Sequence, residues 1–173
     1  MNDRLTNTKI RGTINMENKI FHLTKAKFQE LKKEYDALVA AEHTKAIDEE
    51  APKMVESDDL NPEFVSFQEG MELMRARIDK LEDILKHHQL IKKPPKEKQV
   101  FVNLGARVKV EVNGKKDEFV MVGTLEAHPE LGKISNESPV GAALMGRKIG
   151  EEVVIDSPEK TKYKIKNITY EVS

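Results

Sequence analysis

The sequence contains no cysteine, and this absence excludes several kinds of chemistry. A chain without thiols forms no disulfides, no thiolate metal sites and no thiol nucleophiles. It also lacks any run near the roughly 18 apolar residues of a membrane-spanning helix, so we expect no membrane partner. Residues 1–16 lack the apolar core of a signal peptide, and we expect them to be a flexible extension of a cytoplasmic protein.

Apolar residues are scarce as well. They make up 38% of the 173 residues, below the roughly 45–50% of ordinary soluble domains, while charged residues reach 34%. This composition favours a large exposed helical surface around one modest core. The formal net charge of −1 gives no sign of a polyanion-binding protein, so any electrostatic function must come from local asymmetry.

A first long helix is predicted over residues 25–50, which are rich in strong helix formers. Thr24 is a suitable N-cap, and Leu23 before it is expected to form half of a hydrophobic staple. Pro52 ends the helix because it has no backbone donor. The apolar positions step by three and four and therefore share one face: Phe28, Leu31, Tyr35 and Leu38.

A second helix begins at Asn61, a good N-cap, followed by Pro62 and Glu63, which suit the first helical turn. The helical pattern ends at residues 87–89. Its apolar positions alternate steps of three and four, a heptad pattern that calls for a partner helix. These positions are Phe64, Phe67, Met71, Met74, Ile78, Leu81 and Leu85.

The two helices have similar lengths and a short connection, so we predict an antiparallel coiled coil about 40 Å long. A dimerisation coil or a spacer is the simpler alternative. A hairpin longer than stability requires indicates that it reaches toward a distant partner.

The remaining sequence predicts a small antiparallel sheet with one short helix, and hence an α+β protein. Asn113 and Gly114 mark a tight hairpin turn. Ser138 and Pro139 begin the short helix, which Gly146 ends. Strands are predicted over residues 100–102, 106–112, 119–122, 153–155 and 163–170. The domains are then an extension (1–16), a helical hairpin (17–91), a stiff basic linker (92–99) and a sheet domain (100–173).

Negative charge is concentrated where the hairpin turns. Residues 48–72 contain nine acids and one base, a local balance of −8. Asp58, Asp59 and Glu63 lie at the chain reversal, where their carboxylates crowd together. Such carboxylates are oxygen ligands for magnesium, which takes only one or two from a protein and completes its shell elsewhere. A solvated acidic loop is the alternative interpretation.

The C-terminal part resembles the signature of the Gre-type transcript cleavage factors of bacteria, the GreA/GreB family. The matching segments are Gly132-Lys133-Ile134-Ser135-Asn136-Glu137-Ser138-Pro139-Val140-Gly141, the run from Leu144 to Val153, and Glu126-Ala127-His128-Pro129-Glu130. Weaker matches to the family's two helices extend the resemblance over residues 21–168.

This resemblance implies an FKBP-like C-terminal domain without prolyl isomerase activity. It implies docking at the rim of the secondary channel of bacterial RNA polymerase, which we assign to Ser135, Asn136, Glu137, Ser138 and Pro139. It further implies that the hairpin enters the channel as a monomer and reaches the 3′ end of the nascent RNA. There, tip carboxylates share a magnesium ion with the polymerase and assist cleavage of a backtracked transcript. The factor is then no enzyme and has no tightly bound cofactor.

The tip departs from the family pattern Gly-Asp-Leu-x-Glu-Asn-Ala-Glu-Tyr. This chain has Asp58-Asp59-Leu60-Asn61-Pro62-Glu63-Phe64, two residues fewer, and lacks the tip glutamate. Asp59 matches the family aspartate, Asp58 replaces its glycine, and Glu63 is a reserve that Pro62 holds in the first helical turn. Assisted cleavage, channel occupancy without cleavage, and a plain coiled-coil interaction protein remain as hypotheses.

Overall fold

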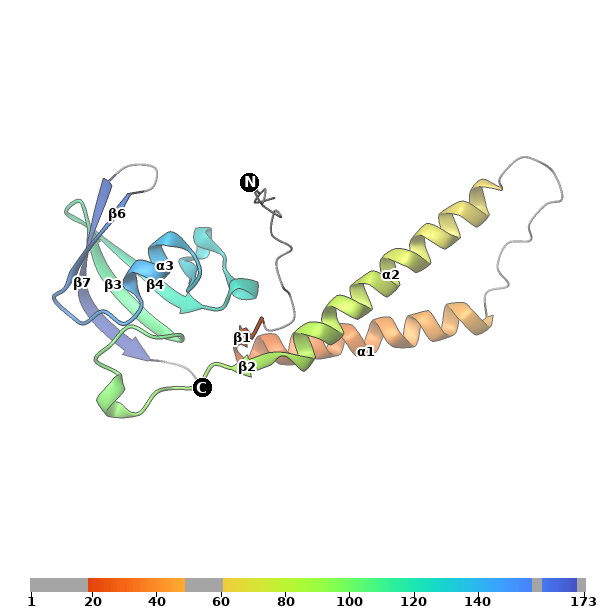
Figure 1. The fold of residues 1–173 in the computed structure, drawn as a ribbon, viewed down its shortest axis with the longest axis horizontal. Coiled ribbons are helices and arrows are strands. Elements are labelled where there is room, and N and C mark those ends of the chain that lie inside the picture. Colours follow the sequence, from red (N-terminus) through yellow and green to blue (C-terminus); the bar gives the residue numbers. More distant parts are fainter. Residues whose placement is uncertain (1–18, 49–60, 157–159, 171–173) are drawn as a thin grey trace, which may run out of the picture.

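The computed structural model describes residues 19–48, 61–156 and 160–170, which form a helical hairpin and a sheet domain (Figure 1). The hairpin consists of α1 (Lys25–Asp48) and α2 (Pro62–Lys86). Both helices project from one side of the sheet domain, so the α1 end and the α2 start lie farthest from it. The predicted α+β architecture is confirmed.

The helix starts follow the sequence signals. Thr24 Oγ1 accepts the backbone N–H of Lys27 at 3.2 Å, and Asn61 Oδ1 accepts that of Glu63 at 3.0 Å. Each bond satisfies one of the backbone donors that a helix leaves free in its first turn. Pro62 occupies the first position of α2, as predicted, and His87 caps the other end.

The two helices pack most tightly at the hairpin base, next to the sheet domain. Leu81 is fully buried there, and Ile84 is buried where the heptad pattern predicted Leu85, which is only half-buried. An ion pair between Arg77 and Glu34 (2.6 Å) also joins the helices, although such exposed pairs add little stability. The base cluster comprises Leu23, Leu31, Leu81 and Ile84, with Phe21, Phe28, Tyr35, Leu38, Leu85 and Leu125 packed against it.

A two-stranded parallel sheet, not predicted, closes the hairpin base. It pairs β1 (Phe21–Leu23) with β2 (His88–Leu90), immediately before α1 and after α2. The backbone N–H of Ile91 donates to the Leu23 carbonyl at 2.7 Å and extends the pairing. The two ends of the hairpin are therefore tied together by backbone hydrogen bonds.

The sheet domain contains five strands in the order β5-β4-β3-β7-β6. All neighbours are antiparallel except β4 and β5, which run parallel. The strands are β3 (Ala106–Val112), β4 (Lys115–Val122), β5 (Lys133–Ser135), β6 (Glu152–Asp156) and β7 (Lys160–Tyr170). Short helices are α3 (Pro139–Leu144) and the 3₁₀ turns η2 (Lys96–Lys98), η3 (Thr124–Glu126) and η4 (Pro129–Leu131).

The predicted strand over residues 100–102 is wrong. Phe101 forms only an isolated bridge with Lys148, and its N–H donates to the Lys98 carbonyl of the η2 turn at 3.3 Å. Its carbonyl accepts the Tyr170 hydroxyl at 2.6 Å, a side chain rather than a neighbouring strand. Val102 exchanges backbone hydrogen bonds with Arg147 and Gly146 at 2.8 and 2.7 Å, but this pairing is too short to make a strand. β-branched composition alone therefore misled the prediction.

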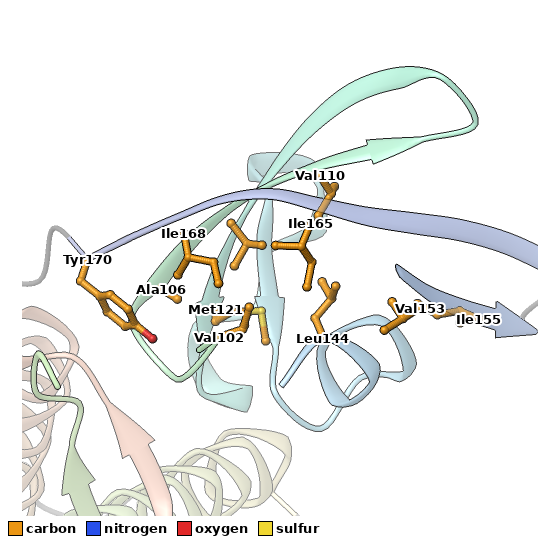
Figure 2. Packing of buried hydrophobic residues seen from close by; sticks show 11 residues of the cluster. Val102, Ala106, Val110, Met121, Leu144, Val153, Ile155, Ile165, Ile168 and Tyr170 are labelled. Atoms are coloured by element: carbon orange, nitrogen blue, oxygen red, sulfur yellow. The ribbon is translucent and has the colours of Figure 1, made fainter. Parts of the chain in front are cut away.

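The core of the sheet domain lies between the curled sheet and α3 (Figure 2). Alternate residues of β3 point inward, as the period of two requires. Leu144 of α3 points toward Ile165 of β7, and both are fully buried. The cluster comprises Val102, Ala106, Val108, Val110, Met121, Leu144, Val153, Ile155, Ile165, Ile168 and Tyr170.

Tyr170→Phe is expected to destabilise the sheet domain by about 1–3 kcal/mol. The buried Tyr170 hydroxyl donates to the Phe101 carbonyl and accepts the Asn103 backbone N–H at 3.0 Å. Burial raises the pKa of this phenol, so it stays protonated and able to donate at neutral pH. Urea unfolding measures the loss. Tyr163→Phe is the control, since no hydrogen bond from its side chain is found within the described chain, and an equal loss there would contradict the assignment.

Candidate functional site

The acidic end of the hairpin is only partly within the described residues. Asp58 and Asp59 lie outside them, so their proposed crowding with Glu63 has no structural test. Glu63 is exposed in the first turn of α2, where the sequence placed it. With 25 residues, α2 spans about 37 Å. Leu81 and Ile84 of the base cluster lie 18 and 21 positions after Glu63, which is thus held about 30 Å from them.

No metal centre is formed by the described residues alone. Across 19–48, 61–156 and 160–170, no three histidines, aspartates or glutamates come close enough to share a metal ion. Two of the five histidines have side-chain partners within the protein: His88 stacks on Phe28 with ring centroids 4.4 Å apart, and His87 contacts Asp83 at 2.8 Å. Ligation of magnesium at the tip therefore requires residues 49–60 or oxygen ligands from a partner.

The Ser135 to Pro139 block, predicted to dock on a partner, is first of all a structural loop. Ser135 is only 7% exposed, and its Oγ accepts the Glu137 backbone N–H at 3.0 Å. Ser138 Oγ donates to the Ser135 carbonyl at 2.7 Å and caps α3 by accepting the Gly141 N–H at 3.1 Å. The two serines hold the loop, and Glu137 and Pro139 are left exposed for contacts with a partner.

The same loop explains why a glycine stands at position 141. A Cβ there would lie 1.9 Å from the Ser135 carbonyl oxygen, far inside van der Waals contact. The backbone of α3 can approach the loop only without a side chain at this position.

Gly141→Ala is expected to cost about 3 kcal/mol, near the upper end of the cost of overpacking. Gly70→Ala is the matched control, because Gly70 is exposed within α2 and a Cβ there meets nothing within 4 Å. That change should stabilise the protein by about 0.5–1 kcal/mol. Chemical denaturation of both variants checks the opposite signs, and destabilisation of equal size would contradict the close approach.

Glu137 links this loop to the hairpin. Its carboxylate lies 3.5 Å from Lys19 Nζ, just before β1. A hydrogen bond from Thr124 and the Lys19 charge lower the pKa of Glu137 below its usual range. One residue of the predicted docking block thus already has a partner within the chain, across the seam between the two parts.

The main contact across that seam was not predicted. Thr24 donates to the Glu126 carboxylate twice, from its backbone N–H at 2.6 Å and from its hydroxyl at 2.8 Å. Leu125 packs against the hairpin base cluster, and the Gly123 backbone meets the His22 carbonyl. Glu126 and Thr24 are 102 positions apart, so no local sequence pattern links them.

Comparison with known proteins adds to this geometry. Residues 96–170 match the family model for the C-terminal domain of the transcription elongation factors GreA/GreB. The chain is 35% identical over 153 residues to transcription elongation factor GreA of Thermodesulfovibrio yellowstonii, covering 86% of this chain and 96% of that protein. The chain belongs to the GreA/GreB family. The predicted resemblance is thereby confirmed.

Other relatives of this Gre-family chain match over different lengths. GreA of Thermomicrobium roseum is 37% identical over 101 residues, which span 58% of this chain and 65% of that relative. The crystal structure of GreA factor homolog 1 (Gfh1) of Thermus thermophilus is 26% identical, covering 87% of this chain and 99% of that one, with a TM-score of 0.38. In the described part of this Gre-family chain, no helix is long and apolar enough to cross a membrane.

Proposed function

We propose that this Gre-family protein binds bacterial RNA polymerase as an accessory elongation factor and inserts its hairpin into the secondary channel. One observation carries the proposal: two long helices, packed at their base, hold Glu63 about 30 Å away from the base cluster. A tip so distant from the sheet domain suits an active centre that belongs to a partner.

The tip supplies carboxylates rather than a complete active site. Asp58 and Asp59 would contribute oxygen ligands to a magnesium ion shared with the polymerase, with Glu63 in reserve, and carboxylates are the ligands that this ion accepts. When bound, the ion would activate water for hydrolysis of the backtracked transcript near its 3′ end. The local balance of −8 would attract a cation to these side chains.

A second candidate function is channel occupancy without cleavage, which modulates or inhibits transcription. The sequence of the tip favours it, because the chain is two residues shorter there than the family pattern and lacks the tip glutamate. Pro62 also fixes Glu63 in the first turn of α2, which limits how far its carboxylate can move.

Docking of the sheet domain is assigned to the Ser135 to Pro139 loop. Asn136, Glu137 and Pro139 present its outer surface, and the two serines keep it rigid. A rigid loop loses little conformational entropy on binding.

Transcript cleavage in backtracked complexes of the cognate polymerase tests the proposal. We expect the wild-type factor to shorten the RNA in a magnesium-dependent manner. If it binds polymerase but never shortens RNA at any magnesium concentration, channel occupancy is the correct function. If affinity capture recovers no polymerase subunits, neither candidate holds.

A further inference from the structure

The N-terminus of α1 lacks acidic residues of its own. Its first turn contains Lys25 and Lys27, and no aspartate or glutamate. A helix N-terminus carries partial positive charge and unpaired N–H groups, so two lysines there are unfavourable. The sheet domain provides what the helix lacks: the Glu126 carboxylate bonds both the N–H and the hydroxyl of the cap residue Thr24.

The surrounding contacts hold the same two segments together. Just before Glu126 in the chain, Leu125 packs against the hairpin base cluster and Gly123 lies against β1. A Cβ on Gly123 would lie 1.9 Å from the His22 carbonyl oxygen, so the two backbones touch. A third contact, the exposed Lys19–Glu137 ion pair, lies at the same seam.

From these contacts we infer that the segment 123–126 is a latch that fixes the direction of the hairpin relative to the sheet domain, with Glu126 as its positioning residue. The chain passes between the two parts once, through the segment that follows β2, and one such connection leaves their angle free. The latch removes that freedom. Its consequence for transcription rests on the proposed function, because only a hairpin that must reach a fixed point needs a fixed direction.

The bond geometry distinguishes which substitutions break the latch. Glu126→Ala removes both acceptors of Thr24 and leaves the lysine-flanked helix N-terminus uncompensated. Glu126→Gln retains the contact, since its amide oxygen accepts the Thr24 N–H and its amide nitrogen donates to the Thr24 hydroxyl oxygen. Gly123→Ala breaks the same seam from its backbone side. Glu130→Ala is a matched control, because Glu130 is an exposed glutamate of the next turn, η4.

Spin-label distance measurements on the free protein test the latch. The chain has no cysteine, so Ser66→Cys on α2 and Val154→Cys on β6, both exposed, give two unique labels. We expect one narrow distance peak for the unaltered latch, Glu126→Gln and Glu130→Ala. For Glu126→Ala and Gly123→Ala, we expect a broad distance distribution in place of this peak. A narrow, unshifted peak in both of these variants would overturn the inference.

Transcription assays distinguish failure of the latch from failure of the proposed function. With cognate polymerase, the Glu126→Ala factor should bind but lose roughly 10²-fold in its effect on cleavage or elongation, as expected for an active group misplaced by about 1 Å. Glu126→Gln should restore that effect. A broad distance distribution with full transcriptional effect would refute the positioning role. Absence of any effect from the wild-type factor would count against the proposed function and leave the distance result standing.

Discussion

Replacing Asp58 and Asp59 with asparagine is expected to reduce factor-stimulated transcript cleavage by at least about tenfold, with polymerase binding retained. Asparagine preserves the size of each side chain but removes the charge that a magnesium ion prefers in an oxygen ligand. Loss even of an outer contact to a bound metal commonly costs about 10–100-fold, so loss of direct ligands should cost no less. Cleavage rates in backtracked complexes, at several magnesium concentrations, measure the effect.

The control for charge alone uses two acidic residues of α2. Glu69→Gln with Glu72→Gln removes two exposed acids from α2 but leaves Asp58 and Asp59 in place. This double variant should cleave within about twofold of wild type, because screened charges more than about 10 Å from a site contribute little. If both double variants lose cleavage equally, negative charge in general, and not the tip carboxylates, is what matters.

Leu81→Ala should give the largest loss of stability, about 2–5 kcal/mol, and should disable the hairpin. Leu81 is fully buried in the base cluster, where α2 meets both α1 and β1. Its truncation leaves a cavity at the place where the two helices are packed most tightly. Thermal unfolding followed by helical circular dichroism measures this, and polymerase assays should show a parallel loss of transcriptional effect.

Leu73→Ala is the matched control in the same helix. Leu73 is 74% exposed, so its truncation should change the unfolding free energy by less than about 0.5 kcal/mol. A large loss at this position would show that the outer half of α2 is covered by something other than α1. Equal effects of the two substitutions would contradict the base cluster as the hairpin's main support.

Much of the architecture was predictable because helix caps and tight turns depend only on residues a few positions apart. Thr24 and Asn61 cap the helices they precede, and Ser138 begins α3, since each needs only neighbours a few positions away. The turn at Asn113 has positive φ angles at both central residues, as an Asn-Gly hairpin turn requires. The heptad positions of α2 likewise predicted the buried Met71, Ile78 and Leu81.

The features that the sequence did not predict depend on contacts between residues far apart in the chain. The parallel pairing of β1 with β2 joins residues 67 positions apart in register, and three residues in each strand give too short a pattern to recognise. The Glu126 contact with Thr24 has no local signature either. The burial of Ser135 was not predicted either, because a family signature does not say which of its side chains hold the loop and which are exposed; docking by this loop stays a prediction.

A cleavage reagent attached to the hairpin tests the account most directly. The chain has no cysteine, so an iron chelate can be tethered to Ser66→Cys near the start of α2, with Val154→Cys on the sheet domain as reference. In stalled complexes of the cognate polymerase, the hairpin reagent should cut the RNA close to its 3′ end, whether or not the tip stimulates cleavage. Cuts from the sheet-domain position alone, or from neither, would contradict insertion of the hairpin into the channel.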